Sequence, residues 1–239
     1  MSDRYVHITS RLSAALDLLK GYDCVADVGC DHGRLTAALL QGKICSRVIA
    51  SDISVPSLEK AKRLINRIGV AEQVSFRVGD GCSVLKPGEC DAIAILGMGG
   101  TLMCRILEAC QPTLMGAKAV VLQPMRAQDD VREYLHRKGF RITGDRIVLD
   151  RSRYYQIFKA VPGYGQEPLP DGFPSGFYDV GYRSFADRDD NLAALCIQQL
   201  RFHKEMLITA AGTEGEVRLL KKVDAIETIL KHIETGEVK

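Results

Sequence analysis

The sequence lacks the features that mark metal-binding, membrane and secreted proteins. Its eight cysteines include no Cys-x-x-Cys pair, so neither a zinc knuckle nor any other metal site is predicted. No apolar run is long enough to span a bilayer, and the first residues are polar, which argues against a signal peptide. We therefore expect a cytoplasmic protein without membrane contact, whose cysteines are reduced and mostly buried.

The sequence also lacks a large excess of acidic or of basic residues. The 32 basic and 30 acidic side chains leave a net charge of +2, too small to indicate a nucleic-acid partner unless basic residues gather locally. There is no internal repeat and no low-complexity segment. A length of 239 residues accommodates one α/β domain and a small second one.

Short apolar runs alternate with helical patterns from residue 24 to about residue 140. The expected strands are 24–28, 48–51, 74–78, 92–96, 119–122, 141–149 and 154–161, and the expected helices are 8–19, 35–40, 56–68, 102–110 and 131–138. This alternation predicts an α/β fold with a Rossmann-like, mostly parallel sheet. The last two strands follow one another directly, which predicts an antiparallel edge hairpin.

The composition changes after residue 161. Residues 162–176 are rich in Pro and Gly and are expected to form a linker or irregular loop. Two amphipathic helical patterns follow on either side of Gly212, which predicts a small coiled-coil-like helical hairpin. We therefore expect a Rossmann-like domain over residues 1–161 and a linker with the hairpin over 162–239.

The segment VADVGCDHGRL, residues 25–35, combines a strand, a glycine turn and the start of a helix. In a dinucleotide fold this turn lies against a pyrophosphate, and Asp31 would repel it. S-adenosylmethionine has no phosphate and carries an ammonium and a sulfonium, which Asp27 or Asp31 would attract. The turn from Gly29 to Gly33 therefore favours S-adenosylmethionine (SAM) as cofactor; the alternative is a structural turn with a helix-capping Asp.

Acids also follow the next two strands. Asp52 stands where a carboxylate commonly accepts both ribose hydroxyls, and Asp80 in Gly79-Asp80-Gly81 could accept from the adenine amino group. The alternatives are a helix N-cap and a plain turn. The predicted cofactor-binding residues are Asp27, Gly29, Asp31, Asp52, Ile53, Asp80, Gly81 and Gly97.

Small residues end the fourth strand, beside the expected methyl position. The run Gly97-Met98-Gly99-Gly100 would let a substrate ring approach the backbone. Gln123 and Pro124, at the end of the fifth strand, could form another wall of the same pocket. The alternatives are a flexible turn and a strand terminator.

Taken together, these motifs resemble the bacterial tRNA (adenine(22)-N1)-methyltransferase family over nearly the full length. The resemblance rests on Arg11-Leu12, Asp27-Val28-Gly29 with Asp31-His32, Ala50-Ser51-Asp52, Gly79-Asp80-Gly81, Gly97-Met98-Gly99-Gly100 and Leu122-Gln123-Pro124, followed by a C-terminal hairpin. It implies methyl transfer from SAM to N1 of a tRNA adenine, position 22, with a coiled-coil-like appendage. Two positions depart from the family: Cys30 stands where Ser is more common, and Met125 where Asn often follows.

The chemistry needs positioning more than activation. Neutral adenine has a lone pair and no proton on N1, so no strong base is required, and the product ring is cationic. We expect Asp31 to supply negative charge and His32 to orient the base, beside the backbone of Gly97, Met98, Gly99 and Gly100. His32 could instead be only a supporting residue outside the substrate contact.

An adenine N1 in RNA is reached only when the base is splayed or flipped out. Tyr154, Tyr155, Tyr178 and Tyr182 could stack on exposed bases. The predicted substrate-binding residues are Arg11, Gln123, Pro124, Arg201, Lys204, Lys221 and Lys222, the last four as phosphate contacts. The alternative functions are a small-molecule methyltransferase and a non-catalytic RNA-binding protein. For the basic residues of the hairpin, the alternative is a merely solvated helix surface. We expect a monomer or weak dimer.

Overall fold

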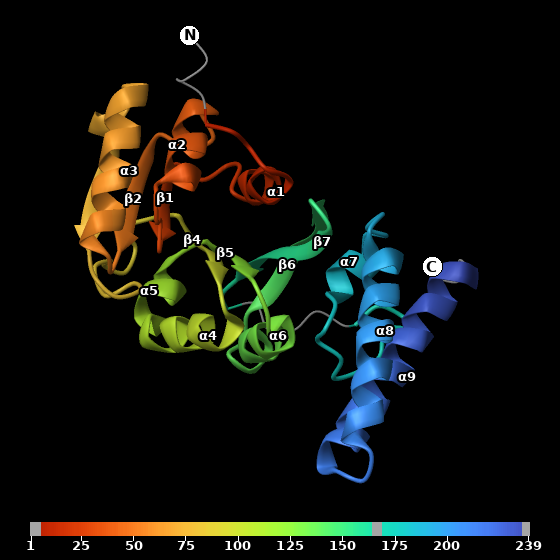
Figure 1. Cartoon of the computed structure of the whole chain (residues 1–239). Coiled ribbons are helices and arrows are strands. Elements are labelled where there is room, and N and C mark those ends of the chain that lie inside the picture. Colours follow the sequence, from red (N-terminus) through yellow and green to blue (C-terminus); the bar gives the residue numbers. More distant parts are fainter. Residues whose placement is uncertain (1–5, 164–168, 236–239) are drawn as a thin grey trace.

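A computed structural model of the chain describes residues 6–163 and 169–235. Its centre is a seven-stranded sheet in the order β3-β2-β1-β4-β5-β7-β6, parallel except for β7 (Figure 1). The strands are β1 (Cys24–Val28), β2 (Arg47–Asp52), β3 (Val74–Val78), β4 (Ala92–Met98), β5 (Ala119–Pro124), β6 (Arg141–Asp150) and β7 (Arg153–Val161). The predicted parallel sheet with an antiparallel edge hairpin is confirmed.

Helices cover both faces of the sheet (Figure 1). On one face lie α1 (Ser10–Leu18), α2 (Arg34–Gln41) and α3 (Val55–Ile68), and on the other α4 (Gly100–Ala109), α5 (Gln111–Gly116) and α6 (Gln128–Arg137). Helix α5 and the short 3-10 helix Ala71–Gln73 were not predicted. Strand β1 is buried at all five positions, which explains its continuous apolar run.

The C-terminal part packs against the sheet through a core of its own. It contains α7 (Tyr182–Ala186), which was not predicted, and the long helices α8 (Leu192–Ala210) and α9 (Glu214–Thr235). Phe173 of the Pro/Gly-rich stretch, and Phe177 and Val180 just after it, are buried together with Ile147 of β6. The expected linker is irregular, as predicted, and Phe173 anchors its described part on the C-terminal core; residues 164–168 lie outside the described residues. The free end of the α8–α9 hairpin projects away from the sheet (Figure 1).

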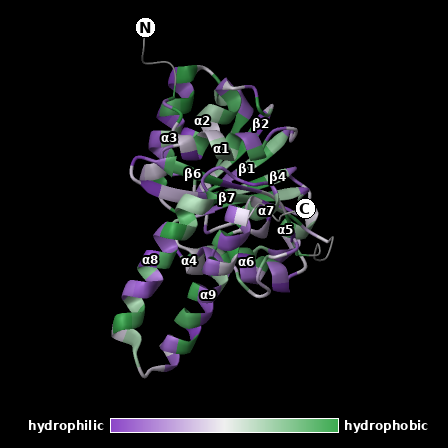
Figure 2. Ribbon diagram, turned by 90° about the vertical axis from the view of Figure 1, so that its right-hand side faces the viewer, coloured by the Kyte–Doolittle hydropathy of each residue, from purple (hydrophilic) through white to green (hydrophobic). Residues whose placement is uncertain are grey.

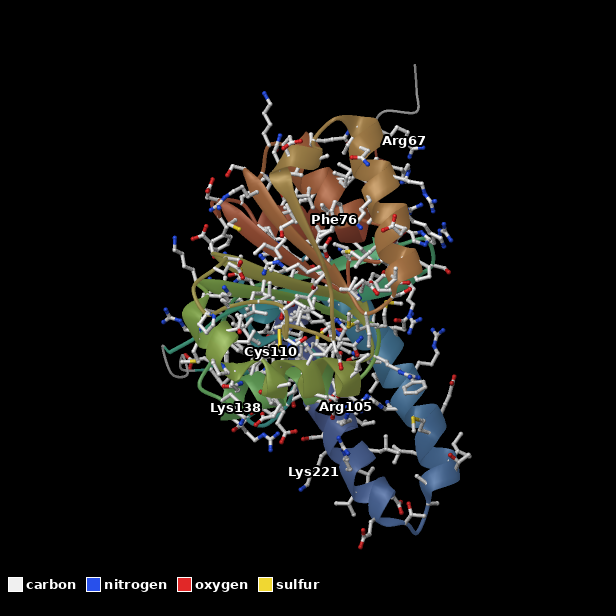
Figure 3. All side chains as sticks on the ribbon, turned by 90° about the vertical axis from the view of Figure 1, so that its left-hand side faces the viewer. Arg67, Phe76, Arg105, Cys110, Lys138 and Lys221 are labelled. Carbon is white, nitrogen blue, oxygen red and sulfur yellow. A yellow bond between two sulfur atoms is a disulfide. The ribbon has the colours of Figure 1, made fainter. Side chains whose placement is uncertain are left out.

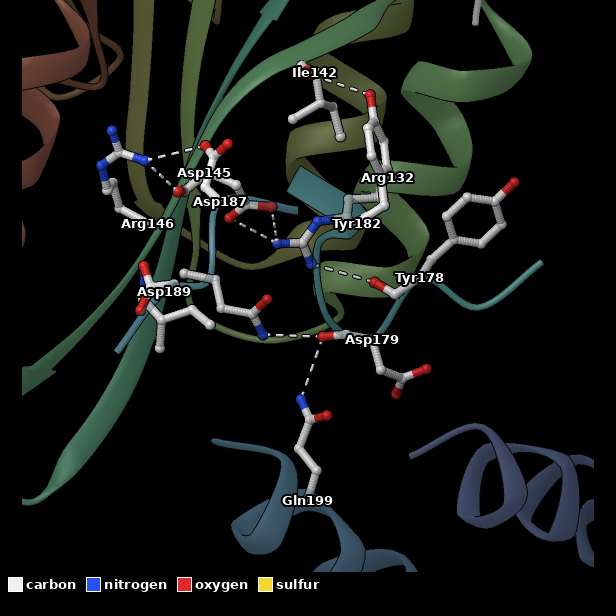
Figure 4. A network of polar contacts seen from close by, with 12 residues as sticks. Arg132, Ile142, Asp145, Arg146, Tyr178, Asp179, Tyr182, Asp187, Asp189 and Gln199 are labelled. Atoms are coloured by element: carbon white, nitrogen blue, oxygen red, sulfur yellow. Dashed lines mark hydrogen bonds and ion pairs between the residues drawn. The ribbon is translucent and has the colours of Figure 1, made fainter. Parts of the chain in front are cut away.

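A fully buried ion pair joins α6 to the edge strand. Arg132 donates through Nη2 to both oxygens of Asp145, at 3.2 and 2.9 Å, and through Nη1 to the carbonyl of Tyr178 (Figure 4). The two side chains are 1% and 0% exposed. A Cβ at Gly181 would overlap the Asp145 carboxylate, so only glycine lets the C-terminal stretch pass over this pair. Removing one partner would leave a buried charge uncompensated.

The cysteines are mostly buried, as expected, but two of them are not free. Cys82 and Cys110 form a disulfide, with their Cα atoms 5.5 Å apart, which corrects the expectation that all thiols are reduced (Figure 3). The disulfide joins the loop after β3 to the end of α4. The other six cysteines are free. Within residues 6–163 and 169–235, no helix is long and apolar enough to cross a membrane.

Candidate functional site

The glycine turn after β1 is fixed to the neighbouring strand β2. The backbone N–H groups of Gly29 and Cys30 donate to the carbonyl of Ser51, at 2.8 and 2.9 Å. The N–H of Asp31 donates to Oδ2 of Asp52, also at 2.9 Å. Asp31 itself has a φ of 47°, a left-handed conformation that Asp tolerates better than most residues. The turn is therefore held open at the carboxyl ends of β1 and β2, where ligands of such sheets bind.

Asp52 organises the adjacent strand ends. Its Oδ1 accepts from the N–H of Ser54 at 2.8 Å, and its backbone carbonyl accepts from the N–H of Gly79 at 3.1 Å. Ile53 next to it is 70% exposed, and Asp80 lies on the surface. The carboxylates of Asp52 and Asp80 and the exposed apolar side chain of Ile53 are groups that suit a ribose and an adenine ring. A Cβ at Gly81 would press on Ile106, so this glycine serves close packing.

Asp27 is the buried acid of the site. Its Oδ2 accepts from both the N–H and the hydroxyl of Thr36, at 3.1 and 2.7 Å. Burial raises the pKa of Asp27 to about 6, and the hydrogen bonds from Thr36 lower it only in part. Asp27 lines the cavity described next, where its carboxylate can meet a cationic group.

A cavity of about 220 Å³ opens between α1, the glycine turn and the ends of β4 and β5. Its lining includes Thr9, Arg11, Asp27, Gly29, Asp31, His32, Leu96, Gly97 and Gln123. The structure thus brings together predicted cofactor and substrate residues from four separate motifs. Asp52, Ile53 and Asp80 are not part of this lining.

The four residues at the end of β4 play different parts. Gly97 has a φ of 77°, and a Cβ there would meet open space, so this glycine leaves room at the cavity. Met98 lies over Gly29, where any Cβ would overlap its side chain. Gly99 faces Arg126, and a Cβ on Gly100 would overlap the carbonyl of Ala127. Only Gly97 therefore has the open approach that was expected for all three glycines.

The rim of the cavity is formed by residues that sequence reasoning did not connect. Arg11 donates through Nε to Asp150 at 2.8 Å, and its guanidinium lies 4.3 Å from the ring centroid of Tyr155. Arg153 donates to the carbonyl of Met125. The turn between β6 and β7 thus reaches the same edge as β5, because β6 runs parallel to β5 through the antiparallel β7.

The four tyrosines do not gather. Tyr155 lies beside Arg11 at the cavity rim, whereas Tyr154 packs on the C-terminal core. The hydroxyl of Tyr182 donates to the carbonyl of Ile142, and Tyr178 makes an edge contact with His136 (Figure 4). Of the four, only Tyr155 lies against a residue that lines the cavity.

Asp31 and His32, the predicted catalytic pair, lie at the outer rim. Their side chains are 70% and 48% exposed, with His32 Nε2 lying 3.5 Å from Asp31 Oδ1. Lys60 lies 3.2 Å from the same ring nitrogen. Asp27 is the better shielded acid, and a carboxylate interacts more strongly with a cation where water is excluded.

The predicted phosphate contacts of the hairpin differ in their surroundings. Arg201 and Lys221 are exposed, Lys221 on the outer side of α9 (Figure 3), and Lys204 pairs with Glu227 at 2.7 Å. Lys222 is 18% exposed and binds Asp129 and Asp179, at 2.8 and 2.7 Å. Lys222 therefore joins the hairpin to α6, and its ammonium is occupied by two internal carboxylates.

The residues present fit SAM better than a dinucleotide. Asp27, Asp31, Asp52 and Asp80 all surround the strand ends, which suits a cationic ligand with a ribose and disfavours a pyrophosphate. No group of three or more His, Cys, Asp or Glu side chains in the described part of the chain could hold a metal ion. The fold and this site define a Rossmann-like methyltransferase.

Comparisons with known proteins agree with this class. A family model described as "Methyltransferase domain" matches residues 8–158. The chain is 30% identical over 236 residues to a Bacillus subtilis tRNA (adenine(22)-N(1))-methyltransferase, covering 96% of this chain and 98% of the relative. The chain belongs to the tRNA (adenine(22)-N1)-methyltransferase family, as its motifs predicted.

Solved structures of similar proteins share the whole fold. The crystal structure of the B. subtilis M1A22 tRNA methyltransferase TrmK has a TM-score of 0.79 and 30% identity, covering 96% of this chain and 99% of that one. The M. capricolum TrmK structure, determined with S-adenosyl-homocysteine, has a TM-score of 0.77 at 17% identity, covering 98% and 100%. The second likeness supports the fold, including the C-terminal part.

Proposed function

We propose that this protein transfers a methyl group from SAM to N1 of an adenine in tRNA, at position 22 as in the name of its B. subtilis relative. The observation that carries the proposal is the cavity lined by Asp27, Gly97 and Gln123, which belong to the neighbouring strands β1, β4 and β5. A ligand's cation and a substrate ring can meet there without a metal and without a strong base.

The proposed cofactor contacts follow from the strand ends. Asp52 accepts from the ribose hydroxyls, Asp80 from the adenine amino group, and Ile53 covers the adenine ring. Asp27 faces the methionine ammonium, with Asp31 as the outer acid. When bound, SAM supplies the electrophilic methyl: N1 bonds to it, the C–S bond breaks, and the positive charge passes to the adenine ring. The chain itself orients N1, keeps water out and places carboxylate near the developing charge.

The proposed RNA contacts combine the cavity rim and the hairpin. Arg11 lies beside the substrate ring, while Arg201 and Lys221 are exposed and can meet phosphates. Lys204 is also exposed, and it would exchange its surface partner Glu227 for a phosphate. Lys222 is excluded from this set by its two internal carboxylates. We further propose a cytoplasmic enzyme that is a monomer or weak dimer. Exposed apolar side chains on the hairpin, such as Phe202 and Ile208, offer a surface for self-association. Hydrophobic residues alternate with hydrophilic ones along both hairpin helices (Figure 2).

Nucleoside mass spectrometry of treated tRNA tests the proposal. Unmodified tRNA transcripts with A22 should gain 1-methyladenosine when incubated with the protein and SAM. Transcripts with G22 should gain none. Methylation of another nucleoside, or of both transcripts equally, would overturn the assignment to N1 of adenine 22, and absence of any methylation would overturn the activity.

A further inference from the structure

The amide of Gln123 has a fixed orientation at the cavity. Gln123 pairs with Leu96 across the β4–β5 ladder, one residue before Gly97, and is only 3% exposed. Its Nε2 lies 3.1 Å from the carbonyl oxygen of Pro124 and 3.5 Å from Sδ of Met125. Both are acceptors, so the nitrogen must be on this side, because the opposite orientation would place two carbonyl oxygens together.

Gln123 lines the cavity, and with Nε2 bonded to Pro124 the other atom of the amide, Oε1, is the one left for a ligand there. Across the described residues no hydrogen bond is made to Oε1 of Gln123. The atom is not completely sealed from solvent, so a ligand can reach it. A partly desolvated acceptor without a partner costs free energy until a ligand supplies an N–H or O–H group. A donor group of a ligand in this cavity would satisfy Oε1 of Gln123.

Adenine carries such a donor next to its reacting atom. Its N6 amine is attached to the carbon that adjoins N1, so a ring with N1 facing the methyl group presents an N–H beside it. Resting on the proposed function, we propose that Gln123 Oε1 accepts a hydrogen bond from N6 of the target adenine and thereby selects adenine among the purines. Guanine has a carbonyl oxygen at this place, which would face Oε1 as a second acceptor, and its N1 carries a hydrogen.

The same hydrogen bond strengthens during the reaction. As the N1–methyl bond forms and the C–S bond breaks, the cofactor departs as a neutral thioether and the ring becomes cationic, with no proton transferred. Part of this charge resides on the N6 amine, which becomes a stronger donor. The bond to Oε1 therefore stabilises the transition state more than the bound substrate, and its loss lowers kcat as well as raising KM.

A substrate lacking only the amine isolates this contact. Two otherwise identical tRNA transcripts carry either adenosine or purine riboside at the target position; purine riboside keeps the N1 lone pair and has no N6. The kcat/KM ratio, adenosine over purine riboside, is measured for the wild type and for Gln123→Met. The variant ratio retains any difference in intrinsic N1 reactivity, so the quotient of the two ratios reports the contact. We expect a quotient of about 10 to 100.

Controls separate this role from damage to the fold or to cofactor binding. Gln111 bonds Leu107 and Tyr134 outside the cavity, and Gln111→Met should keep the wild-type ratio. Calorimetric affinity for S-adenosylhomocysteine should stay within about threefold in Gln123→Met, because the amide bonds Pro124 and Met125 and none of the predicted cofactor-binding residues.

Equal ratios in the wild type and Gln123→Met would overturn the inference. Equal methylation of both transcripts by the wild type would overturn it without any variant, so a misfolded variant does not weaken the test. If the wild type methylates A22 tRNA in the mass-spectrometric assay, the proposed function stands whichever way these ratios fall. If it methylates no tRNA at all, both fall together.

Discussion

The carboxylate of Asp52 accepts a hydrogen bond from the backbone N–H of Asp31, with 2.9 Å between Oδ2 and the nitrogen. This contact joins the end of β2 to the glycine turn after β1 and holds Asp31 at its left-handed φ of 47°. Asp52, which we propose binds the ribose, therefore also shapes the glycine turn, which we propose contacts the rest of the cofactor. Loss of one side chain should affect both parts of the cofactor site.

Replacing Asp52 should weaken cofactor binding strongly. A lost charge-assisted hydrogen bond costs about 1.5–3 kcal/mol, so Asp52→Ala should lower the affinity for S-adenosylhomocysteine tenfold or more in isothermal titration. Asp52→Asn should fall between, because its single oxygen cannot accept from both Asp31 and Ser54. A folded Asp52→Ala protein with wild-type affinity would remove Asp52 from the site.

Cofactor affinity should depend on pH through Asp27. Its pKa of about 6 lies above the usual value of 3.8, so below pH 6 the carboxyl is increasingly neutral and attracts the ligand ammonium less. Affinity for S-adenosylhomocysteine should rise between pH 5 and about 7, with release of a proton on binding near pH 6. Calorimetry in two buffers of different ionisation enthalpy measures that release.

The variant Asp27→Asn should abolish this proton release. In the unliganded wild-type protein, the ionisation of Asp27 should change stability in the direction opposite to its effect on cofactor affinity. The folded state binds the Asp27 proton more tightly than the unfolded chain, so this group lowers the free energy of unfolding as pH rises from about 4 to 6. A proton release in Asp27→Asn equal to that of the wild type would assign the titration to another group.

Gly97 and Gly139 form a matched pair for the cavity. Both have positive φ, 77° and 76°, with open space where a Cβ would lie, but only Gly97 lines the cavity. Alanine at either position should cost about 1–2 kcal/mol of stability, measured by denaturant unfolding. Gly97→Ala alone should also suppress methyl transfer while S-adenosylhomocysteine binding persists. Equal activity of the two variants would mean that no substrate approaches Gly97.

Lys221 and Lys222 are neighbours with opposite expected effects. Lys222→Met leaves Asp129 and Asp179 without their shared cation and should lower the free energy of unfolding by about 2–4 kcal/mol. Lys221→Met should leave stability unchanged within about 0.5 kcal/mol. It should weaken tRNA binding and reduce the slope of log affinity against log salt by about one. Wild-type tRNA affinity and slope in Lys221→Met would mark the residue as merely solvated.

The sheet was predictable because its signals are local. A buried parallel strand such as Cys24–Val28 is apolar along its whole length, and Gly and Asp residues follow each strand at the edge where ligands bind. Helix α5 was missed because its six residues, beginning Gln111-Pro112, are too few to show a helical period. Helix α7 is shorter still, with five residues, and its buried residue Phe185 belongs to the C-terminal core.

The sequence indicated which strand ends carry the candidate site residues, but it did not indicate which side chains contact one another. Sequence alone gave no means of distinguishing Lys222, which is internal, from exposed Lys221, because the difference depends on Asp129 and Asp179 from other elements. The part played by Asp150 was missed for the same reason: it meets Arg11 across 139 positions of sequence. One signal was available, since an acid that ends a strand running parallel to β5 belongs to the ligand edge.

The passage of Gly181 over Asp145 has a consequence for how this chain could be recombined with its relatives. The C-terminal segment is not an interchangeable cassette, because its glycine must face a carboxylate buried in β6 and held by Arg132 of α6. A chimera joined after residue 161 would therefore need a glycine opposite Asp145. Any larger residue at the position of Gly181 would displace the Asp145 carboxylate from its buried ion pair with Arg132. Productive crossovers should instead lie upstream of α6, so that the ion pair and the glycine that covers it are inherited together.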